Sequence, residues 1–477
     1  FSGSASDVGG TIALSAQRGR LGPIFADRTR LDGNYRLLAG RGDLALVADY
    51  AADSATLAAA TLAPLVAPLD QAGPTPLGPI ARTIAAALRR TAGNFDASGR
   101  LRLVNGRGGG GVRIETAYAA SGGARVAVSG GDGITYYWPD ARVRVDGDIA
   151  MGGGGLPRAN VILRQPRQGG PMSGEARIQP YAVGNSRLAL APVTFRAGRD
   201  GSTLVTTQAM LDGPFSGGFV RGLRVPISGT IGGAGGGFAF GRGCIDTAFQ
   251  SLTVGALRLN ASRLPICATG PALVYKSGQG PVRIGGETRN LRLGGQLGRS
   301  PFALDAARAR LTGGDRFAAS GLGVRMGKAE APVRVTAASL DGRIARGGVT
   351  GSFGDATAVI GKVPLRLSDA RGTFDFRGGA LAIRGASTVS DMAALPRFYP
   401  LASNDLTFRL ANDLIRAAGT LRHPGSGTAV TNVTITHRLS SGNGEALLDV
   451  PGIRFGNALQ PDQLTRLAEG VVALVNG

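Results

Sequence analysis

Residues 101–115 have the sequence LRLVNGRGGGGVRIE. In each half, two apolar residues flank an arginine, Arg102 in the first and Arg113 in the second. This period-two alternation puts apolar side chains on one face of a strand and polar side chains on the other. The glycines between the halves adopt turn conformations that other residues avoid. The stretch therefore predicts a β-hairpin with one apolar face and one solvated face.

The same alternation recurs along almost the whole chain, at spacings of roughly 8 to 15 residues. Turn signals such as Asp132-Gly133 and Asp341-Gly342 separate the runs. Antiparallel strands with one wet face produce this pattern. We predict a mainly β protein in which an elongated antiparallel sheet curls into a groove of U-shaped cross-section. The further runs lie at 142–146, 257–259, 291–293, 333–335, 365–367, 374–376, 381–383, 406–410 and 433–435.

The composition supports a β protein and excludes a disordered chain. The 477 residues include 78 glycines, more than twice the usual share of about 7%. Because glycine costs roughly 1 kcal/mol in a helix interior, an all-helical fold is disfavoured. Hydrophobic residues make up 43% and charged residues 18%, which is too apolar for a disordered segment.

The net charge of +21 raises the question of a nucleic-acid partner. The basic residues are scattered arginines, since the chain has three lysines, Lys276, Lys328 and Lys362, and no run of five basic residues. Aromatic residues, at 5%, offer few stacking platforms. We therefore expect no nucleic-acid partner. A solvated arginine-rich exterior explains most of the charge, and an anionic lipid surface is the alternative.

Helical signals are confined to three places. Residues from about Asp53 to Ala67 are rich in Ala and Leu, and residues Leu77–Ala92 place apolar side chains at helical spacing. A Pro-rich loop joins the two, which predicts a helical hairpin inserted in the sheet. A third, short helix is expected over Pro461–Leu474. The predicted layout is a groove start at 1–50, the insertion at 51–98, a continuous groove at 99–459 and the helix at 460–477.

Catalytic motifs are not evident. Residues Gly106–Gly111 satisfy GxGxxG, but the strand-like run that follows lacks the helix that a phosphate site needs. His423 and His437 belong to no nucleophile motif, and we expect both to be solvated. No enzyme activity and no cofactor are predicted.

Metal ligands are not evident either. Asp140, Asp146 and Asp148 lie on the polar side of a strand, without the terminal glutamate of a calcium loop. Two distant cysteines and two histidines do not form a zinc motif. We predict no metal site.

The two cysteines, Cys244 and Cys267, flank a segment that resembles two strands and a turn. In an oxidising compartment they would form one local disulfide. In the cytosol they would be two unrelated buried thiols. The favoured prediction is the disulfide.

The densest aromatic cluster is Tyr136-Tyr137-Trp138. Such rings are favoured at the level of lipid headgroups. Packing within the sheet is the simpler interpretation.

The apolar strand face is the main candidate for function. It consists of Leu, Val, Ile, Ala and Phe and could shield acyl chains at about 25 cal/mol per Å². An ordinary core packed on a second sheet is the alternative, and the alternation alone does not separate the two. The candidate lining residues are Val112, Ile114, Val143, Val145, Leu257, Leu259, Val333, Val335, Leu365, Leu367, Phe374, Phe376 and Phe408.

Three stretches resemble one family of bacterial envelope proteins. They are the Pro-interrupted helical segment at 61–88 with the strand-like run at 95–105, the pair Cys244 and Cys267 with ASRLPIC at 261–267, and the closing stretch 447–477 with its FGNALQP motif. The chain is similar here to the YdbH group of the AsmA/TamB-like proteins. The resemblance extends along the full length through the one-sided strands.

The resemblance implies a repeating β-groove that transports phospholipid between the inner and outer membranes of a Gram-negative bacterium. It implies a periplasmic location, an inner-membrane anchor outside this segment and an outer-membrane lipoprotein partner, and it implies no catalytic residue. Two rival functions are a secreted β-solenoid structural or adhesin segment, which would show a fixed repeat length, and a glycan-processing β enzyme.

Overall fold

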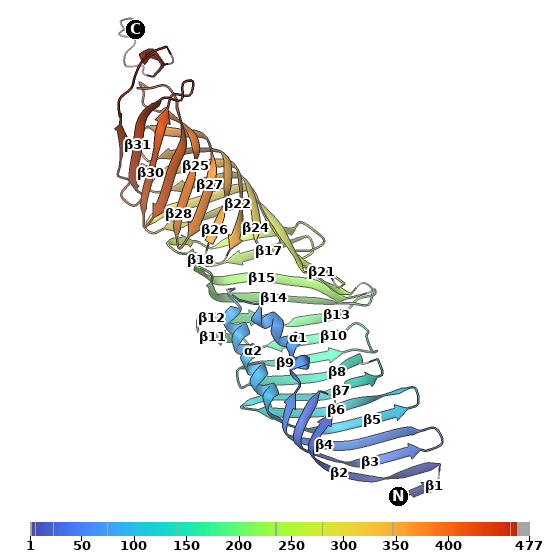
Figure 1. Cartoon of the computed structure of the whole chain (residues 1–477). Coiled ribbons are helices and arrows are strands. Elements are labelled where there is room, and N and C mark those ends of the chain that lie inside the picture. The colour runs from blue at the N-terminus through green and yellow to red at the C-terminus, as the bar shows by residue number, and fades with distance from the viewer. Residues whose placement is uncertain are drawn as a thin grey trace. The chain divides into compact units, whose positions relative to one another are not determined.

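The computed structural model describes residues 2–464 apart from residues 5, 22, 74, 141, 234–235, 279, 346–347 and 458. Strands account for 69% of the chain and helices for 7%. Long neighbouring strands pair antiparallel in sequence order, as from β22 (Arg283–Leu297) to β28 (Ala380–Asp391) (Figure 1). The predicted mainly β, antiparallel fold is confirmed.

The chain divides into two compact units. Unit 1 comprises residues 1–214, 223–242 and 275–282, and unit 2 comprises residues 215–222, 243–274 and 283–477. The prediction treated 99–459 as one continuous groove. The boundaries of the units fall within residues 214–283, a stretch that contains six described strands of only three to seven residues.

Unit 1 is an antiparallel sheet with two helices. Its longest strands have 15 residues, and β15 supplies residues to both units. The strands of this part of the chain are β1 (Ser2–Ser4), β2 (Asp7–Leu21), β3 (Ile24–Leu38), β4 (Asp43–Leu57), β5 (Phe95–Gly106), β6 (Gly109–Ser121), β7 (Ala124–Trp138), β8 (Arg142–Gly153), β9 (Leu156–Arg164), β10 (Ser173–Ile178), β11 (Tyr181–Val183), β12 (Ser186–Leu190), β13 (Val193–Ala197), β14 (Ser202–Phe215), β15 (Gly218–Gly232), β16 (Gly237–Phe240) and β21 (Val274–Ser277).

The helical hairpin is present but shorter than predicted. Helix α1 spans Ala59–Asp70 and α2 spans Gly78–Gly93. Residues 53–57, expected to be helical, instead continue β4 in register with β3, because the strand ladder outweighs the helix preference of the Ala-rich segment. Helix α2 contacts β4, β6, β9, β11 and β12. Its Ala87 packs with Ala124 and Leu156, so α2 covers one row of strand ends.

Unit 2 is a second run of antiparallel strands. Its strands are β17 (Cys244–Phe249), β18 (Ser251–Val254), β19 (Leu257–Leu259), β20 (Ser262–Ala268), β22 (Arg283–Leu297), β23 (Ser300–Thr312), β24 (Arg316–Met326), β25 (Val333–Ala345), β26 (Gly348–Ile360), β27 (Leu365–Arg377), β28 (Ala380–Asp391), β29 (Leu401–Ala411), β30 (Leu414–Arg422), β31 (Ala429–Arg438) and β32 (Gly444–Asp449).

A line of bends crosses the sheet of unit 2. Asn290, Gly321, Asp355 and Asp369 have positive φ angles of 52°, 60°, 48° and 51°. They lie in β22, β24, β26 and β27, where the ladder skips a pair or shifts register. Gly, Asn and Asp adopt this left-handed conformation at the lowest cost. Bulges of this kind bend strands, so the line folds the sheet into two arms.

The predicted C-terminal helix lies largely outside the described residues. Within them, a short 3-10 helix spans Pro461–Gln463. Leu459 and Leu464 are buried against the core of unit 2, and the backbone N–H of Tyr399 donates to the carbonyl oxygen of Leu464.

Candidate functional site

The apolar faces of unit 2 enclose a cavity of about 460 Å³, which we call the lumen. Residues from β19 and from the strands between β22 and β31 line it. All lining residues are apolar or glycine except Ser387 and Thr407. The rings of Phe317 and Phe374 approach to a centroid distance of 6.5 Å within this lining. Such a wall excludes polar groups and accepts hydrocarbon of flexible shape.

Eight of the predicted lining residues lie in the wall of the lumen. Val333 and Leu365 are almost fully buried, whereas Val335 and Phe374 are partly exposed to the lumen. Leu259 lies two residues from Leu257 on β19 but is 5% exposed and outside the wall. The eight residues are Leu257, Val333, Val335, Leu365, Leu367, Phe374, Phe376 and Phe408.

The sequence analysis missed other wall residues, among them Phe302, Phe317, Leu340 and Phe353. For Phe317, Leu340 and Phe353 the bends explain why, because the inward set moves by one residue at each bend. On β25, for example, inward residues follow every second position up to Ala337 and then resume three positions later. The isolated Asn, Asp and Gly residues at the bends are the signal that would have located the shift.

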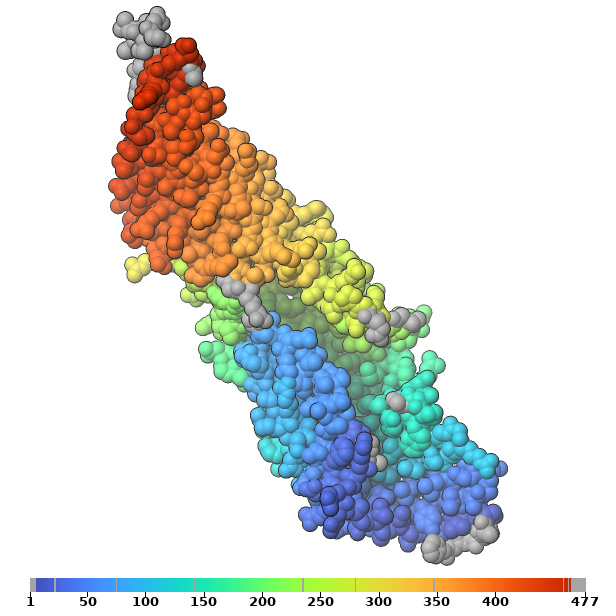
Figure 2. Space-filling model, in the orientation of Figure 1, coloured from blue at the N-terminus to red at the C-terminus, as the bar shows by residue number. Residues whose placement is uncertain are grey.

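The four predicted lining residues of unit 1 share one face of the sheet. Val112 pairs with Tyr136, which pairs with Val143. Ile114 is linked in the same way through Ile134 to Val145. Val143 is 52% exposed, so this face is not filled as a closed core would be. Figure 2 shows a hollow in unit 1 beside the blue helices α1 and α2.

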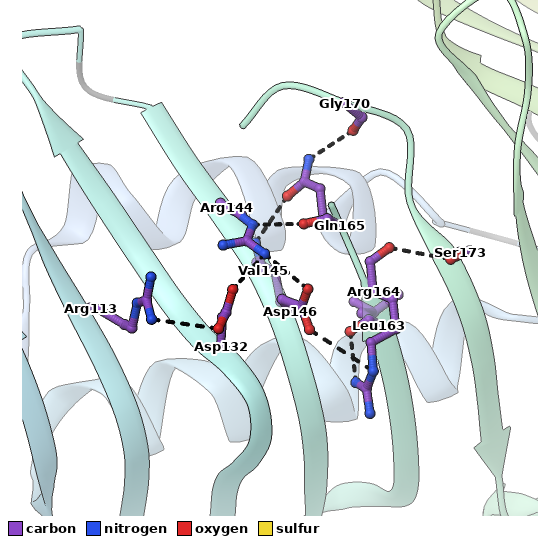
Figure 3. Close-up of polar contacts among 10 residues, drawn as sticks. All are labelled: Arg113, Asp132, Arg144, Val145, Asp146, Leu163, Arg164, Gln165, Gly170 and Ser173. Carbon is purple, nitrogen blue, oxygen red and sulfur yellow. Dashed lines mark hydrogen bonds and ion pairs between the residues drawn. The ribbon is translucent and has the colours of Figure 1, made fainter. Parts of the chain in front are cut away.

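The opposite face of the unit 1 sheet carries a network of ion pairs (Figure 3). Arg144 contacts Asp132 at 2.8 Å and Asp146 at 3.1 Å, and Arg164 contacts Asp148 at 2.8 Å. The helices lie behind the sheet in this view, so the ion pairs and the helices occupy opposite sides. The acidic residues of β8 are thus neutralised by arginines of the same and neighbouring strands.

A bulge in β7 brings Asp132 into this network. The pairing of β7 with β8 shifts between Ser129 and Gly133, and Gly131 has a φ of 59°. The hydrogen bond from Arg144 is the main cause that lowers the pKa of Asp132, and Arg113 adds to it. The carboxylate therefore stays ionised and ties the bulge to Arg113 and Arg144.

The Gly-rich segment is a hairpin turn, as predicted, and not a phosphate loop. β5 and β6 pair from Asp96–Ala120 to Gly106–Gly109. The indole N–H of Trp138 donates to Asn105 Oδ1 at 3.0 Å, so Trp138 packs over this hairpin, whereas Tyr136 is 41% exposed.

The cysteines form a disulfide, Cys244–Cys267, between directly opposed residues of β17 and β20. The prediction for His437 was wrong: it is 1% exposed on the inner side of β31, opposite Ile415. Burial lowers the pKa of its ring, partly offset by Asp413. His423 is half-buried in a turn that it stabilises through Ser426.

No helix among the described residues is long and apolar enough to cross a bilayer. The described residues also contain no group of three His, Cys, Asp or Glu that could hold a metal ion. No known protein family, no curated protein and no solved structure matches this chain.

Proposed function

We propose that this chain carries phospholipid, holding acyl chains against the apolar faces of its curled sheet. The observation that carries the proposal is the lumen of unit 2, whose lining is apolar or glycine apart from Ser387 and Thr407. Acyl chains gain roughly 0.8 kcal/mol for each CH₂ group removed from water. They need no directional partner, which suits a wall of this composition.

The half-exposed apolar face of unit 1 supports the same proposal. Leu14, Tyr136 and Val143 are 52%, 41% and 52% exposed. Large apolar side chains left on one face of a sheet mark a surface that a ligand or partner covers. The polar network on the other face keeps that side in water, so one face remains for hydrocarbon.

The proposed setting is the periplasm of a Gram-negative bacterium, with phospholipid moving from the inner to the outer membrane. An inner-membrane anchor and an outer-membrane lipoprotein partner would act through parts of the protein beyond this chain. The disulfide supports an oxidising compartment. The proposal includes no enzymatic step, no cofactor and no nucleic acid.

The rival solenoid function receives less support. Solenoid stalks of the β-helix type stack parallel coils of fixed length, whereas these strands pair antiparallel and vary from 3 to 15 residues.

Lipid co-purification tests the proposal. The chain is expressed in the periplasm, extracted with organic solvent, and its lipids are identified by mass spectrometry. We expect phospholipid in stoichiometric amount. A folded protein that carries no lipid would overturn the proposal.

A matched pair of variants locates the lipid. Val335→Asp places a charge in the lumen wall, and Thr336→Asp places the same charge on the exposed outer face of the same strand. Since an isolated charge in an apolar site is costly, Val335→Asp should lose its lipid while Thr336→Asp keeps it. Circular dichroism checks that both variants are folded. Equal lipid content in the two would mean that the lumen is not the binding site.

A further inference from the structure

The two rows of strand ends in unit 2 meet each other. The first rim consists of the turns at 255–256, 298–299, 327–332 and 361–364. The second rim consists of the turns at 378–379, 412–413 and 439–443. The rims belong to opposite ends of the strands, so contact between them closes the curled sheet over the lumen. We call this line of contact the seam.

Contacts occur at successive positions along the seam. A methyl group at Gly255 would lie 2.8 Å from the Cα of Gly379, which shows how closely these two turns approach. The hydroxyl of Ser300 donates to Asp413 Oδ1 at 3.2 Å. These contacts join residues more than 110 positions apart, so they are tertiary contacts and not part of the strand ladder.

The seam continues towards β32. A methyl group at Gly327 would lie 3.6 Å from Leu439 Cδ2, and one at Gly442 would lie 3.4 Å from Ala331 Cβ. The turn at Gly361 lies against the ring of His437. The first two contacts pair a turn of the first rim with a turn of the second rim, and the third pairs a turn of the first rim with the end of β31.

Between Ser300 and Asp413 the seam is weakly held compared with the ladder, whereas towards β32 it is held by the buried core that includes Leu439 and Met326. Between Ser300 and Asp413 there is one side-chain hydrogen bond, and the contacts at the glycines are van der Waals contacts. Each ladder, in contrast, has around ten paired residues, as between β24 and β25. Opening the seam between Ser300 and Asp413 therefore leaves the antiparallel pairing intact, and minor forms of this kind commonly make up about 0.1–10% of a protein's population.

A phospholipid cannot pass a closed seam, because its charged headgroup would have to cross the apolar lumen. We propose that the seam is a gate: the rims part between Ser300 and Asp413 to admit acyl chains while the headgroup stays in water. This inference rests on the proposed lipid function and adds the route by which lipid enters unit 2.

The test locks the gate. Ser300→Cys with Asp413→Cys places two thiols across the seam, and oxidation or a short bis-maleimide joins them, as mass spectrometry verifies. Loading is followed with phosphatidylethanolamine vesicles that contain phosphatidylglycerol with a fluorescent acyl chain. The two single-cysteine variants, treated in the same way, are the controls. Asp413→Ala, which removes the acceptor of the Ser300 hydrogen bond, is the opposite perturbation.

If the seam is the gate, the locked variant cannot reach the open form and should load at least about tenfold more slowly than the parent chain and the two single-cysteine controls. Asp413→Ala should load faster than the parent chain. Equal loading by locked and parent proteins would overturn the gate and leave lipid binding intact. A parent chain that takes up no fluorescent lipid would instead overturn the proposed function, so the two failures are distinguishable.

Discussion

At the scale of single residues, the buried charges of unit 2 hold turns in place. Asp391 has a fully buried carboxylate that Arg397 contacts at 2.7 Å and that accepts backbone N–H groups from Ala393 and Arg397. Burial alone would raise its pKa, but these hydrogen bonds prevail and lower the pKa to about 2. One carboxylate thus fixes the loop between β28 and β29.

Asp391→Asn should lower the free energy of unfolding by about 1–3 kcal/mol, because charge-assisted hydrogen bonds are lost. Since the folded pKa is below the ordinary 3.8, the carboxylate stabilises the fold above pH 3.8 and loses this effect as the pH falls towards 2. Urea unfolding between pH 2 and 6 measures both effects. Asp375→Asn, which removes a partner of the exposed Arg377, should cost at most about 1 kcal/mol. Similar losses in the two variants would contradict this interpretation.

His437 should make stability fall in mild acid. Burial lowers its pKa below 6.5, so the unfolded chain binds the proton more readily. The contribution of neutral His437 to the free energy of unfolding is then fully present above pH 6.5 and is lost as the pH falls below it. The loss is about 1.4 kcal/mol for each unit by which burial lowers the pKa. Asp413 opposes the effect, and Lys362 and Arg397 line the neighbouring cavity.

Urea unfolding at pH 5 and pH 7.5 measures the dependence. His437→Gln should flatten it, while His423→Gln, in a turn away from β31, should leave it unchanged. A dependence that persists in His437→Gln would assign it to other groups.

At the scale of elements, the sequence predicted strand faces well and bends poorly. The alternating residues at 333–335 and 365–367 lie in the wall of the lumen, since period two is a direct consequence of the pleat. The set of residues that face the lumen then shifts by one position at Asp355 and Asp369. At these places a residue with positive φ interrupts the pairing between neighbouring strands. Residues such as Phe353 lie beyond these bends, so alternation counted from one end alone assigns them to the wrong face.

The helical boundaries failed for a related reason. Residues 53–57 begin the segment 53–67, which is rich in Ala and Leu and suited to a helix, but β3 offers them a ladder that the local sequence does not reveal. His437 was misjudged because its burial depends on the turn at Gly361, which is 76 residues earlier in the chain. Pairings between distant segments decide both features.

The disulfide is the element-scale feature with the clearest energetic test. It joins β17 to β20 with a sequence separation of 23 residues. Closing a loop of this length should stabilise the fold by about 3 kcal/mol, because the cross-link lowers the conformational entropy of the unfolded chain. The double variant Cys244→Ser with Cys267→Ser should therefore show a lower urea midpoint. Reductant should lower the midpoint of the parent chain to the same value and leave the variant unchanged. A parent chain insensitive to reductant would contradict the expectation.

At the scale of the whole molecule, each unit pairs an apolar face with a polar one, but they differ in how far that face is covered. In unit 1, exposed residues such as Leu14 and Val143 leave it partly open. In unit 2, the rims close over the lumen at contacts such as Ser300 to Asp413. The sequence pattern is the same in both, so alternation predicts the faces and not the degree of closure, which depends on where bends place the strand ends.

Because the lumen of unit 2 exists only in the folded state, we expect lipid bound there to stabilise unit 2 by mass action. A ligand at a hundred times its dissociation constant adds about 2.7 kcal/mol to the folded state. For a unit of this size, that should raise the midpoint of thermal unfolding by roughly 5–10 °C. In Val335→Asp the charge in the lumen wall should prevent lipid binding, so the midpoint should not rise. Thr336→Asp should behave as the parent chain. Differential scanning calorimetry with and without phosphatidylglycerol makes the comparison. An increase of the same size in Val335→Asp would place the lipid outside the lumen, because only binding against that wall is sensitive to its charge.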